Sequence, residues 1–330
     1  MMKPLYLFSS GRLERKNNTI SFVSENEERK YIPVENLTEI YIFGEVDLNK
    51  RVLEFLTEKE ITLHFFNYYG YYVGSYYPRE HYNSSYVLTK QVEKYLNPTE
   101  RLKIAKKFLI GATKNMLRNI KEYSEKIQQL SDFELSIESL FRKILDAEDI
   151  EQLMGIEANI RQTYYETFDL IVDTSNLSFE KRTKRPPENE LNALISFGNS
   201  LLYTAVLSQI YQTHLDPRIG YLHTNNHRRF TLNLDIAEVF KPVLVDRTIF
   251  TLLNRKQITK KDFVKGMNGV FLAESGKKTF VQEFHNRLET SIYSEKLKRN
   301  VSYRSLIRIE VYKLERHIID DQEYQPFVRK

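Results

Sequence analysis

The densest group of residues that could do chemistry is a histidine followed by two acids. His223 precedes a helix-like stretch in which Asp235 and Glu238 stand three residues apart, a spacing that projects both carboxylates from one helix face. Asn225 and Asn226 favour a turn that folds His223 back over that face. One imidazole and two carboxylates suit Mg²⁺ or Mn²⁺ better than structural zinc. The spacing alone favours the simpler interpretation, in which first-turn acids complement a helix dipole.

A third carboxylate is needed if protein side chains are to hold a metal, and Glu157 offers one. It lies in a helix-like stretch beside apolar residues, where an unpaired acid is costly. Arg161 follows one helical turn later, so an ion pair between the two residues and metal ligation by Glu157 are alternatives that composition does not separate. Gly155, two residues earlier, is expected to permit close approach of another backbone.

Cationic residues lie on both sides of these acids in the sequence. A loop that ends in Pro186-Pro187 precedes the most apolar helix-like stretch of the chain, and two more cations follow His223. Runs of charge most often form solvated surface, but a loop held in place by a buried helix can also present its cations to phosphates. Both interpretations stay open for Lys181, Arg182, Lys184, Arg185, Arg228 and Arg229.

The elements that must position these residues change character after Pro78. Short alternating stretches before it predict strands at 5–9, 19–23, 29–33 and 39–42, a helix at 48–59, and a hairpin of 61–66 with 71–76. Helical periodicity follows, with runs predicted at 97–130, 146–171, 188–212, 234–254 and 303–319. Pro242 should kink or break the fourth run.

This pattern predicts an α+β fold with two domains. We expect a small N-terminal β-rich, sandwich-like domain at residues 1–80, a linker or helix at 81–97, and a larger all-α domain at 98–330. The aromatic run at 65–77 is expected to supply sheet core and dimer contact rather than a platform for bases.

Composition excludes several classes of protein. The 330 residues contain no cysteine, which excludes a disulfide framework, a zinc–thiolate site and a cysteine nucleophile. The stretch of about 20 apolar residues that a membrane helix needs is not found, and the N-terminus lacks the features of a signal peptide. Residues 1–80 hold 10 Lys and Arg against 12 Asp and Glu, so the overall charge of +5 leaves +7 on residues 81–330. That excess is a modest footprint for a polyanionic partner.

Several of these segments resemble, in the same order, those of one known family. The matching segments are Gly155-Ile156-Glu157, Arg185-Pro186-Pro187, 192–203, 215–223, Asp235-Ile236-Ala237-Glu238 and Val243-Leu244-Val245-Asp246-Arg247. The chain is similar along its length to the CRISPR-associated protein one family, the endonuclease and integrase of spacer acquisition. The resemblance implies that residues 1–80 serve dimerisation and that the all-α domain at 98–330 is catalytic. It also implies a homodimer in the cytoplasm of a prokaryote, with no membrane involved.

The resemblance also implies the site and its reaction. Glu157, His223 and Glu238 would hold Mg²⁺ or Mn²⁺, with Asp235 as a neighbouring catalytic acid that holds a second metal or orients the ligands. The implied reaction joins the 3′-hydroxyl of a short DNA duplex to a phosphodiester of the repeat array. This transesterification requires no protein nucleophile, which agrees with the absence of cysteine.

The implied substrate is double-stranded DNA, both spacer precursor and repeat array. The six cations of the Pro186-Pro187 loop and of the stretch after His223 are then expected to contact its phosphates. Tyr165 is expected to stack on a base at a frayed end, whereas core packing is favoured for Tyr164. By resemblance, the protein partner would be the small CRISPR-associated protein two.

Two alternatives to this function remain. One is a metal-dependent nuclease or mobile-element integrase of the same fold, outside CRISPR immunity. The other is a non-catalytic nucleic-acid-binding scaffold, in which the carboxylates pair only with Arg161 and other cations.

Overall fold

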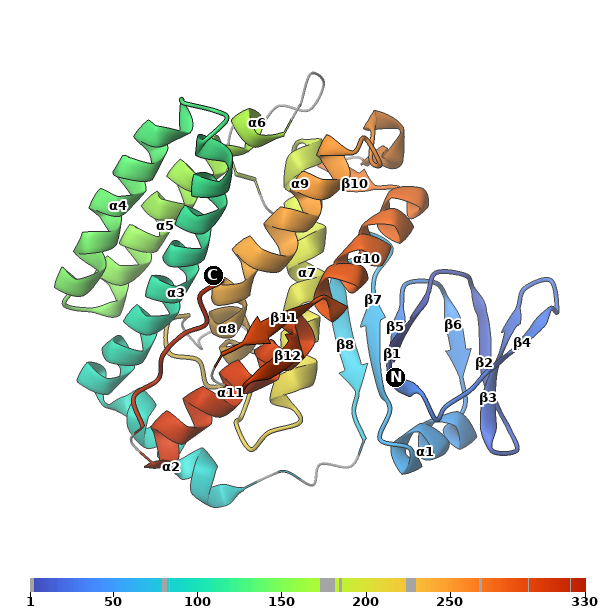
Figure 1. Cartoon of the computed structure of the whole chain (residues 1–330). Helices are drawn as coiled ribbons and strands as arrows, with labels where there is room; N and C mark the ends of the chain where they lie inside the picture. The colour runs from blue at the N-terminus through green and yellow to red at the C-terminus, as the bar shows by residue number, and fades with distance from the viewer. Residues whose placement is uncertain are drawn as a thin grey trace. The chain divides into compact units, whose positions relative to one another are not determined.

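The computed structural model describes residues 3–78, 82, 84–172, 182–183, 186–223, 230–266, 269–295, 297–320 and 322–330 (Figure 1). The chain divides into two compact units, Met1–His81 and Tyr82–Lys330. The first unit is built mainly of strands and the second mainly of helices, which confirms the predicted fold class. The expectation of an all-α second domain needs one correction, because that unit also contains two short β-hairpins.

The N-terminal unit contains two four-stranded sheets. One has the order β1-β5-β7-β8, with parallel pairing except between β7 and β8. Its strands are Lys3–Leu7, Leu37–Ile42, Thr62–Phe66 and Tyr72–Tyr76. The other has the order β4-β3-β2-β6, with strands Arg29–Ile32, Thr19–Ser24, Gly11–Lys16 and Val46–Leu48. The antiparallel β7–β8 pair is the hairpin that the sequence predicts.

One hydrophobic core joins both sheets to a helix of this unit. Helix α1 (Lys50–Glu58) is capped by Asn49, whose side chain accepts a hydrogen bond from Val52 N at 3.1 Å. Its buried face packs into a cluster that also contains residues of both sheets, including Leu13 and Ile40. The family resemblance implies a hairpin at 11–19, which the antiparallel β2–β3 pair confirms. Periodicity alone does not indicate strand β2, because most of its side chains are charged and Leu13 is its one buried residue.

The larger unit surrounds a buried central helix, α7 (Glu190–Ile210). Its other long helices are α2 (Ser85–Leu96), α3 (Pro98–Ser124), α4 (Leu130–Asp146), α5 (Ile150–Glu166), α10 (Glu274–Glu289) and α11 (Tyr303–Asp320). Shorter helices are α6 (Phe168–Ile171), α8 (Leu232–Phe240) and α9 (Arg247–Asn254). The hairpins pair β9 (Phe263–Gly266) with β10 (Gly269–Leu272), and β11 (Ser291–Ser294) with β12 (Arg299–Ser302).

Helix α7 is apolar on all sides, as befits a helix enclosed by others. Among the described residues it is the one helix long and apolar enough to cross a membrane, a length that the sequence analysis did not find. Within the structure, 89% of its apolar stretch is buried. The helix contacts α8, α11, β10 and the turn that follows α8. It therefore serves as the core around which the site-bearing elements are arranged.

Pro242 interrupts the predicted helix at 234–254, but it does not end it. Helix α8 continues through a π-helical turn, η1 (Lys241–Asp246), into α9. Two buried asparagines of α3 donate hydrogen bonds to carbonyls around this turn. Asn115 Nδ2 reaches Val239 O at 2.9 Å and Asn119 Nδ2 reaches Pro242 O at 2.8 Å. The wider turn accommodates the proline ring, and side-chain donors stabilise its carbonyls.

Replacing a helical glycine by alanine should change the free energy of unfolding in opposite directions at two positions, Gly198 and Gly155. A Cβ at Gly198 would lie 2.6 Å from Val245 Cγ1 and 2.8 Å from Phe280 Cζ, whereas a Cβ at Gly155 meets nothing within 4 Å. The expected close approach of another backbone at Gly155 is therefore wrong. Gly198→Ala should lower the free energy of unfolding by about 1–3 kcal/mol through overpacking. Gly155→Ala should raise it by about 0.5–1 kcal/mol through helix propensity.

Denaturant unfolding of the full chain, followed by circular dichroism, measures both changes. The dependence of unfolding free energy on denaturant should be the same for both variants and wild type. Equal stabilities for the two variants would show that the packing around α7 is looser than these distances indicate.

Candidate metal centre

Four elements carry the predicted ligands and the residues that contact them. Glu157 and Arg161 lie on α5, and Glu238 lies on α8. Lys241 begins η1, and His223 ends the described segment that follows α7. All belong to the larger unit. The site therefore depends on contacts between parts of the chain that lie far apart in sequence.

Asp235 organises the segment that bears the histidine. It is fully buried in the first turn of α8, and its carboxylate accepts hydrogen bonds from three backbone N–H groups. The donors are Tyr221 N at 2.5 Å, Leu222 N at 3.0 Å and His223 N at 3.0 Å. Gly220 lets this segment approach, because a Cβ there would lie 2.8 Å from Asp235 Oδ2. Asp235 thus fixes the backbone at residues 221–223 in addition to standing at a helix start.

The same carboxylate fixes the orientation of the His223 ring. Asp235 Oδ1 lies 2.7 Å from His223 Nδ1, and the imidazole is partly exposed, at 13% of its side-chain surface. A carboxylate oxygen accepts this hydrogen bond, so Nδ1 is the donor, and in the neutral tautomer Nε2 is the nitrogen with the lone pair. A histidine held in this way is suited to ligate a cation through Nε2.

Glu238 is buried between two cations. Its Oε2 pairs with Arg161 Nη2 and its Oε1 pairs with Lys241 Nζ, with all three side chains less than a tenth exposed. Burial raises the pKa of Glu238, but the positive charges of Arg161 and Lys241 outweigh burial and hold that pKa well below its usual range. Glu238 is therefore an ionised carboxylate inside the fold.

Arg161 also connects Glu238 to Glu157. Its Nε lies 3.2 Å from Glu157 Oε1, one helical turn earlier on α5. The ion pair that the sequence analysis weighed against metal ligation is therefore present. Arg161 bridges the two glutamates that the family resemblance names as ligands, so one guanidinium lies where a shared cation would neutralise them.

Asp246 is a buried acid that the sequence analysis did not single out. It ends η1, is 1% exposed, and neither of its carboxylate oxygens has a hydrogen-bond partner among the described residues. Burial raises the pKa of Asp246 to about 7, although Arg161, the Tyr164 hydroxyl and Lys241 lower it. In the sequence, Asp246 was named only as part of the segment 243–247 that resembles the family. No neighbouring residue in the sequence indicated a role for its carboxylate.

The side chains of Glu157, His223 and Glu238 are suitable ligands for a divalent cation. In this structure, however, they are paired with other side chains rather than free to bind one. Among the described residues, no three acidic or histidine side chains stand close enough together to hold a metal ion. Two carboxylates and an imidazole of fixed tautomer are nevertheless the donors that Mg²⁺ or Mn²⁺ accepts. Arg161 and Lys241 occupy the Glu238 oxygens, so a metal ligand role for Glu238 requires at least one cation to yield.

Of the predicted DNA-contact residues, Arg182 and Tyr165 are described. Arg182 donates to Asn192 Oδ1 at 2.9 Å and to Ser196 Oγ at 3.0 Å, on the first turns of α7. Its charge also lowers the pKa of Tyr165, an effect smaller than those of burial and of Arg161, so this end of the basic loop lies near the site. Lys181, Lys184, Arg185, Arg228 and Arg229 lie outside the described residues.

Tyr165 and Tyr164 are both part of the core. Tyr164 is fully buried, as expected, and Tyr165 is 5% exposed. The Tyr165 ring packs against Tyr164 and Phe168, with ring centroids 6.1 and 5.2 Å away. Stacking of Tyr165 on a base stays a prediction that would require this packing to open.

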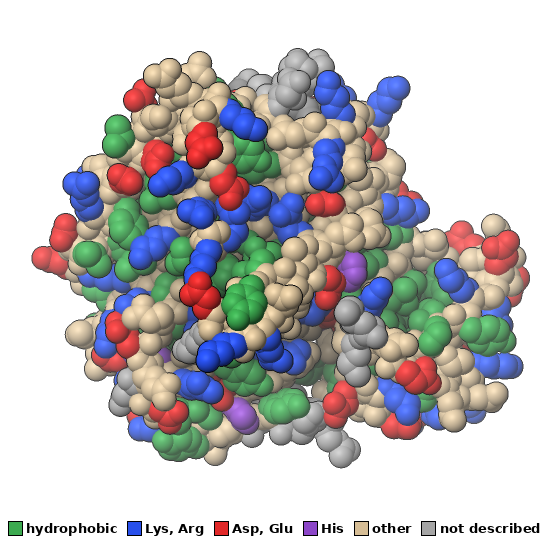
Figure 2. Space-filling view, in the orientation of Figure 1, with side chains coloured by type: hydrophobic (Ala, Val, Ile, Leu, Met, Phe, Trp, Pro, Cys, Tyr) green, Lys and Arg blue, Asp and Glu red, His purple; other side chains and the backbone are tan. Residues whose placement is uncertain are grey.

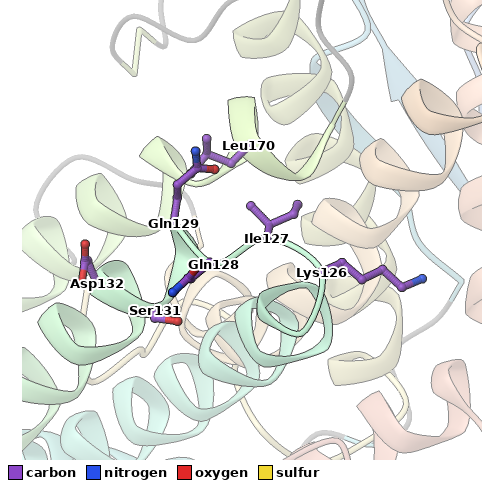
Figure 3. Close-up of a pocket in the computed structure, with 7 residues that line it drawn as sticks. All are labelled: Lys126, Ile127, Gln128, Gln129, Ser131, Asp132 and Leu170. Carbon is purple, nitrogen blue, oxygen red and sulfur yellow. The ribbon is translucent and has the colours of Figure 1, made fainter.

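A surface hollow among the described residues lies elsewhere in the same unit. It is formed where α3 turns into α4, and Leu170 of α6 closes one side (Figure 3). Its lining residues are Lys126, Ile127, Gln128, Gln129, Ser131, Asp132 and Leu170. None of them is a predicted site residue, and one acid beside amides and a lysine offers no set of metal ligands.

Comparison with known proteins identifies the family of the chain. A family model described as CRISPR associated protein Cas1 matches residues 5–286. CRISPR-associated endonuclease Cas1 2 of Thermodesulfovibrio yellowstonii is 54% identical over 328 residues, covering 99% of each chain. The solved structure of a CAS1 protein from Thermotoga maritima is 48% identical, with a TM-score of 0.87, and covers 99% of this chain and 100% of that chain.

More distant solved structures share the fold alone. A casposase bound to integration product has a TM-score of 0.88 at 21% identity, over 99% of this chain and 94% of that chain. A Cas6-RT-Cas1–Cas2 complex has a TM-score of 0.86 at 19% identity, over 100% of this chain and 36% of that chain. With a family match that spans most of its length and a relative more than half identical along all of it, the chain belongs to the Cas1 family of CRISPR-associated endonucleases.

Proposed function

We propose that this chain is the endonuclease and integrase of CRISPR adaptation, which inserts short spacer DNA into the repeat array by 3′-hydroxyl transesterification. Membership of the Cas1 family gives the class of activity. The observation that carries the assignment of the site is the joining of Glu157 and Glu238 by the buried guanidinium of Arg161, with a His223 ring that Asp235 orients in the same unit.

Each side chain has a definable task in this reaction. Glu157, Glu238 and Nε2 of His223 would hold a divalent cation, Mg²⁺ or Mn²⁺. That cation would supply electrophilic activation of the scissile phosphodiester and charge neutralisation of the attacking and leaving oxygens. Asp235 holds the His223 ring and the backbone beside it. Lys241 keeps a positive charge beside Glu238, because burial, which lowers its pKa, is outweighed by that carboxylate.

DNA as the substrate agrees with the distribution of charge. Figure 2 shows Lys and Arg side chains spread over the helical unit and gathered near its centre on the face in view. The proposal places phosphates against the loop that contains Arg182, and against the cations that follow His223. Arg182 is already close to the site, and it would exchange its hydrogen bonds to α7 for contacts to phosphate oxygens.

The proposed partners are a second copy of this chain and the small Cas2 protein. Tyr68, Tyr69 and Val73 at the β7–β8 hairpin are 73%, 43% and 57% exposed, an apolar group of the kind that protein contacts cover. A homodimer through the N-terminal unit fits this surface, and the Cas2 partnership rests on family membership. We also propose that the protein acts in the cytoplasm of a prokaryote.

One observation favours the non-catalytic alternative, namely that the two glutamates pair with Arg161 in this structure. Strand transfer of a labelled duplex into a repeat-bearing plasmid, with and without Mn²⁺, separates the two functions. A scaffold should bind DNA equally well with or without chelator and should neither cut nor join it.

The first prediction concerns the three proposed ligands. Glu157→Gln, His223→Ala and Glu238→Gln should each reduce Mn²⁺-dependent strand transfer to background while DNA affinity stays within a few-fold of wild type. Glutamine is the better substitution at residue 238, because it keeps the side-chain volume and one acceptor oxygen beside Arg161 and Lys241. Loss of the buried negative charge should lower stability by about 3–5 kcal/mol with glutamine and with alanine alike. Gel-based strand transfer and fluorescence anisotropy measure the two quantities.

A matched control is available in the same unit. His214 Nδ1 lies 3.0 Å from Glu315 Oε1, a histidine–carboxylate pair outside the predicted site. His214→Ala should leave strand transfer at the wild-type level. If any ligand variant keeps near-normal strand transfer, that residue does not belong to the metal centre.

A second prediction separates the two roles considered for Asp235. If Asp235 orients His223, Asp235→Asn should reduce strand transfer by ~10–100-fold, and the double variant with His223→Ala should lose no more than His223→Ala alone. An Asp235 that holds a second metal should instead add its own loss to that of His223→Ala. The double-variant cycle is measured on strand-transfer rates at saturating Mn²⁺.

A further inference from the structure

The guanidinium of Arg161 uses two of its three nitrogens. Nε pairs with Glu157 at 3.2 Å and Nη2 pairs with Glu238. Nη1 is buried and has no hydrogen-bond partner within the described residues. Buried guanidinium nitrogens normally find acceptors, so an unpaired one is an exception that calls for an explanation.

Asp246 presents the matching exception. Among the residues that the structure describes, neither buried carboxylate oxygen has a hydrogen-bond partner of ordinary geometry, and the neighbouring Tyr164 hydroxyl acts on Asp246 only by lowering its pKa. Of the charges that act on Asp246, Arg161 has the largest favourable effect. The side chain of Arg161 therefore lies near an acid with which it does not pair, while it pairs with two others.

The balance of charges suggests why Arg161 lies close to Asp246 without pairing with it. Glu157 and Glu238 are neutralised by Arg161, with Lys241 also on Glu238. A divalent cation on the same two carboxylates would compete with Arg161 for their oxygens. A guanidinium that leaves a buried carboxylate cannot remain unpaired inside the fold without a large penalty. It needs another carboxylate within reach.

We propose that Arg161 is a tethered counter-ion that holds Glu157 and Glu238 in the metal-free chain, and that it transfers to Asp246 when a divalent cation binds. The inference rests on the metal centre of the proposed function and assigns Asp246 as the positioning residue that receives the displaced guanidinium. Bidentate pairing of the planar guanidinium with that carboxylate would satisfy Nη1 and both oxygens at once.

Lys241 is less suited to be the cation that moves. It contacts Glu238 but, among the described ion pairs, not Glu157, and its ammonium group lies 5.1 Å from the centre of the Tyr203 ring. That cation–π contact supports the lysine where it is. Of the ion pairs that the structure describes, only those of Arg161 join both proposed ligands, so a shared cation must displace Arg161 first.

The test measures Mn²⁺ affinity of the full chain, from the electron paramagnetic resonance signal of free Mn²⁺ at slightly alkaline pH, where Asp246 is ionised. Asp246→Asn should weaken Mn²⁺ binding by ~10–100-fold, the factor that one charge-assisted hydrogen bond is worth. Arg161→Gln should bind Mn²⁺ at least as tightly as wild type, because no guanidinium then competes. In the Arg161→Gln background, Asp246→Asn should change the affinity by less than about threefold.

Thermal unfolding without metal checks that each variant is folded. Asp246→Asn should be at least as stable as wild type, since it removes an unpaired buried acid, whereas Arg161→Gln should be less stable. Arg329→Gln is the matched control, because Arg329 forms a similar pair with Glu122 at 2.5 Å. It should lower stability with and without Mn²⁺ alike and leave the Mn²⁺ affinity unchanged.

The outcomes separate this inference from the proposed function. An equal loss of affinity from Asp246→Asn in both backgrounds would show that Asp246 acts on the cation directly, which overturns the transfer of Arg161. Unchanged affinity in Asp246→Asn also overturns it, while the metal centre stands. If wild type and Glu238→Gln bind Mn²⁺ equally weakly, the metal centre itself is wrong, and the inference falls with it.

Discussion

Carboxylates enclosed within the helical unit must be matched by positive charge, and the arrangement of the site follows from this constraint. Glu238 is 2% exposed and ionised, so the fold must supply a cation to each of its oxygens. One comes from α5 and the other from η1. The pairing of Arg161 with Glu238 thereby connects two elements 77 residues apart in sequence. The charges that link these elements are also those that a metal must rearrange.

Asp235 solves a related problem by a different route. Its buried carboxylate is matched by backbone N–H groups and by the His223 ring rather than by an Arg or Lys side chain. Because backbone donors carry no net charge to be displaced, this part of the site can stay in place while the other part responds to a cation. The site thus has two parts. Asp235 holds His223 in place, while the ion pairs of Glu238 with Arg161 and Lys241 can be exchanged for others.

The sequence analysis predicted the elements whose ends are marked by capping or turn residues. Asn97 caps α3 through Thr99 N and Glu100 N, as the Asn-Pro start indicates, and the turn at 67–70 gives the β7–β8 hairpin. Strands β6 and β9–β12 and helices α4 and α10 were not predicted. These strands have only three or four residues each, and neither helix has a side-chain cap hydrogen bond. Their positions depend on packing rather than on local sequence.

In the candidate site too, contacts within one helix could be predicted from the sequence, whereas contacts between helices could not. Spacing predicted that Asp235 and Glu238 share a helix, and they do, on α8. Spacing also offered Arg161 as a partner of Glu157. It did not indicate that the same arginine reaches Glu238, or that Asp246 is enclosed without a partner. Those facts depend on how α5 meets α8 and η1, which periodicity within one segment does not encode.

The π-helical turn has a consequence for how this segment tolerates change. In an α-helix, residues five apart point about 140° away from each other, whereas a π turn, with hydrogen bonds that span five residues, brings them toward one side. Lys241 and Asp246 are five residues apart and lie at the two ends of η1. The turn thus acts as a one-residue register insertion between α8 and α9. Deleting a residue there would let a regular α-helix join α8 to α9, and it would remove the wide turn that brings Lys241 and Asp246 toward one side. The segment is therefore constrained in length as well as in composition.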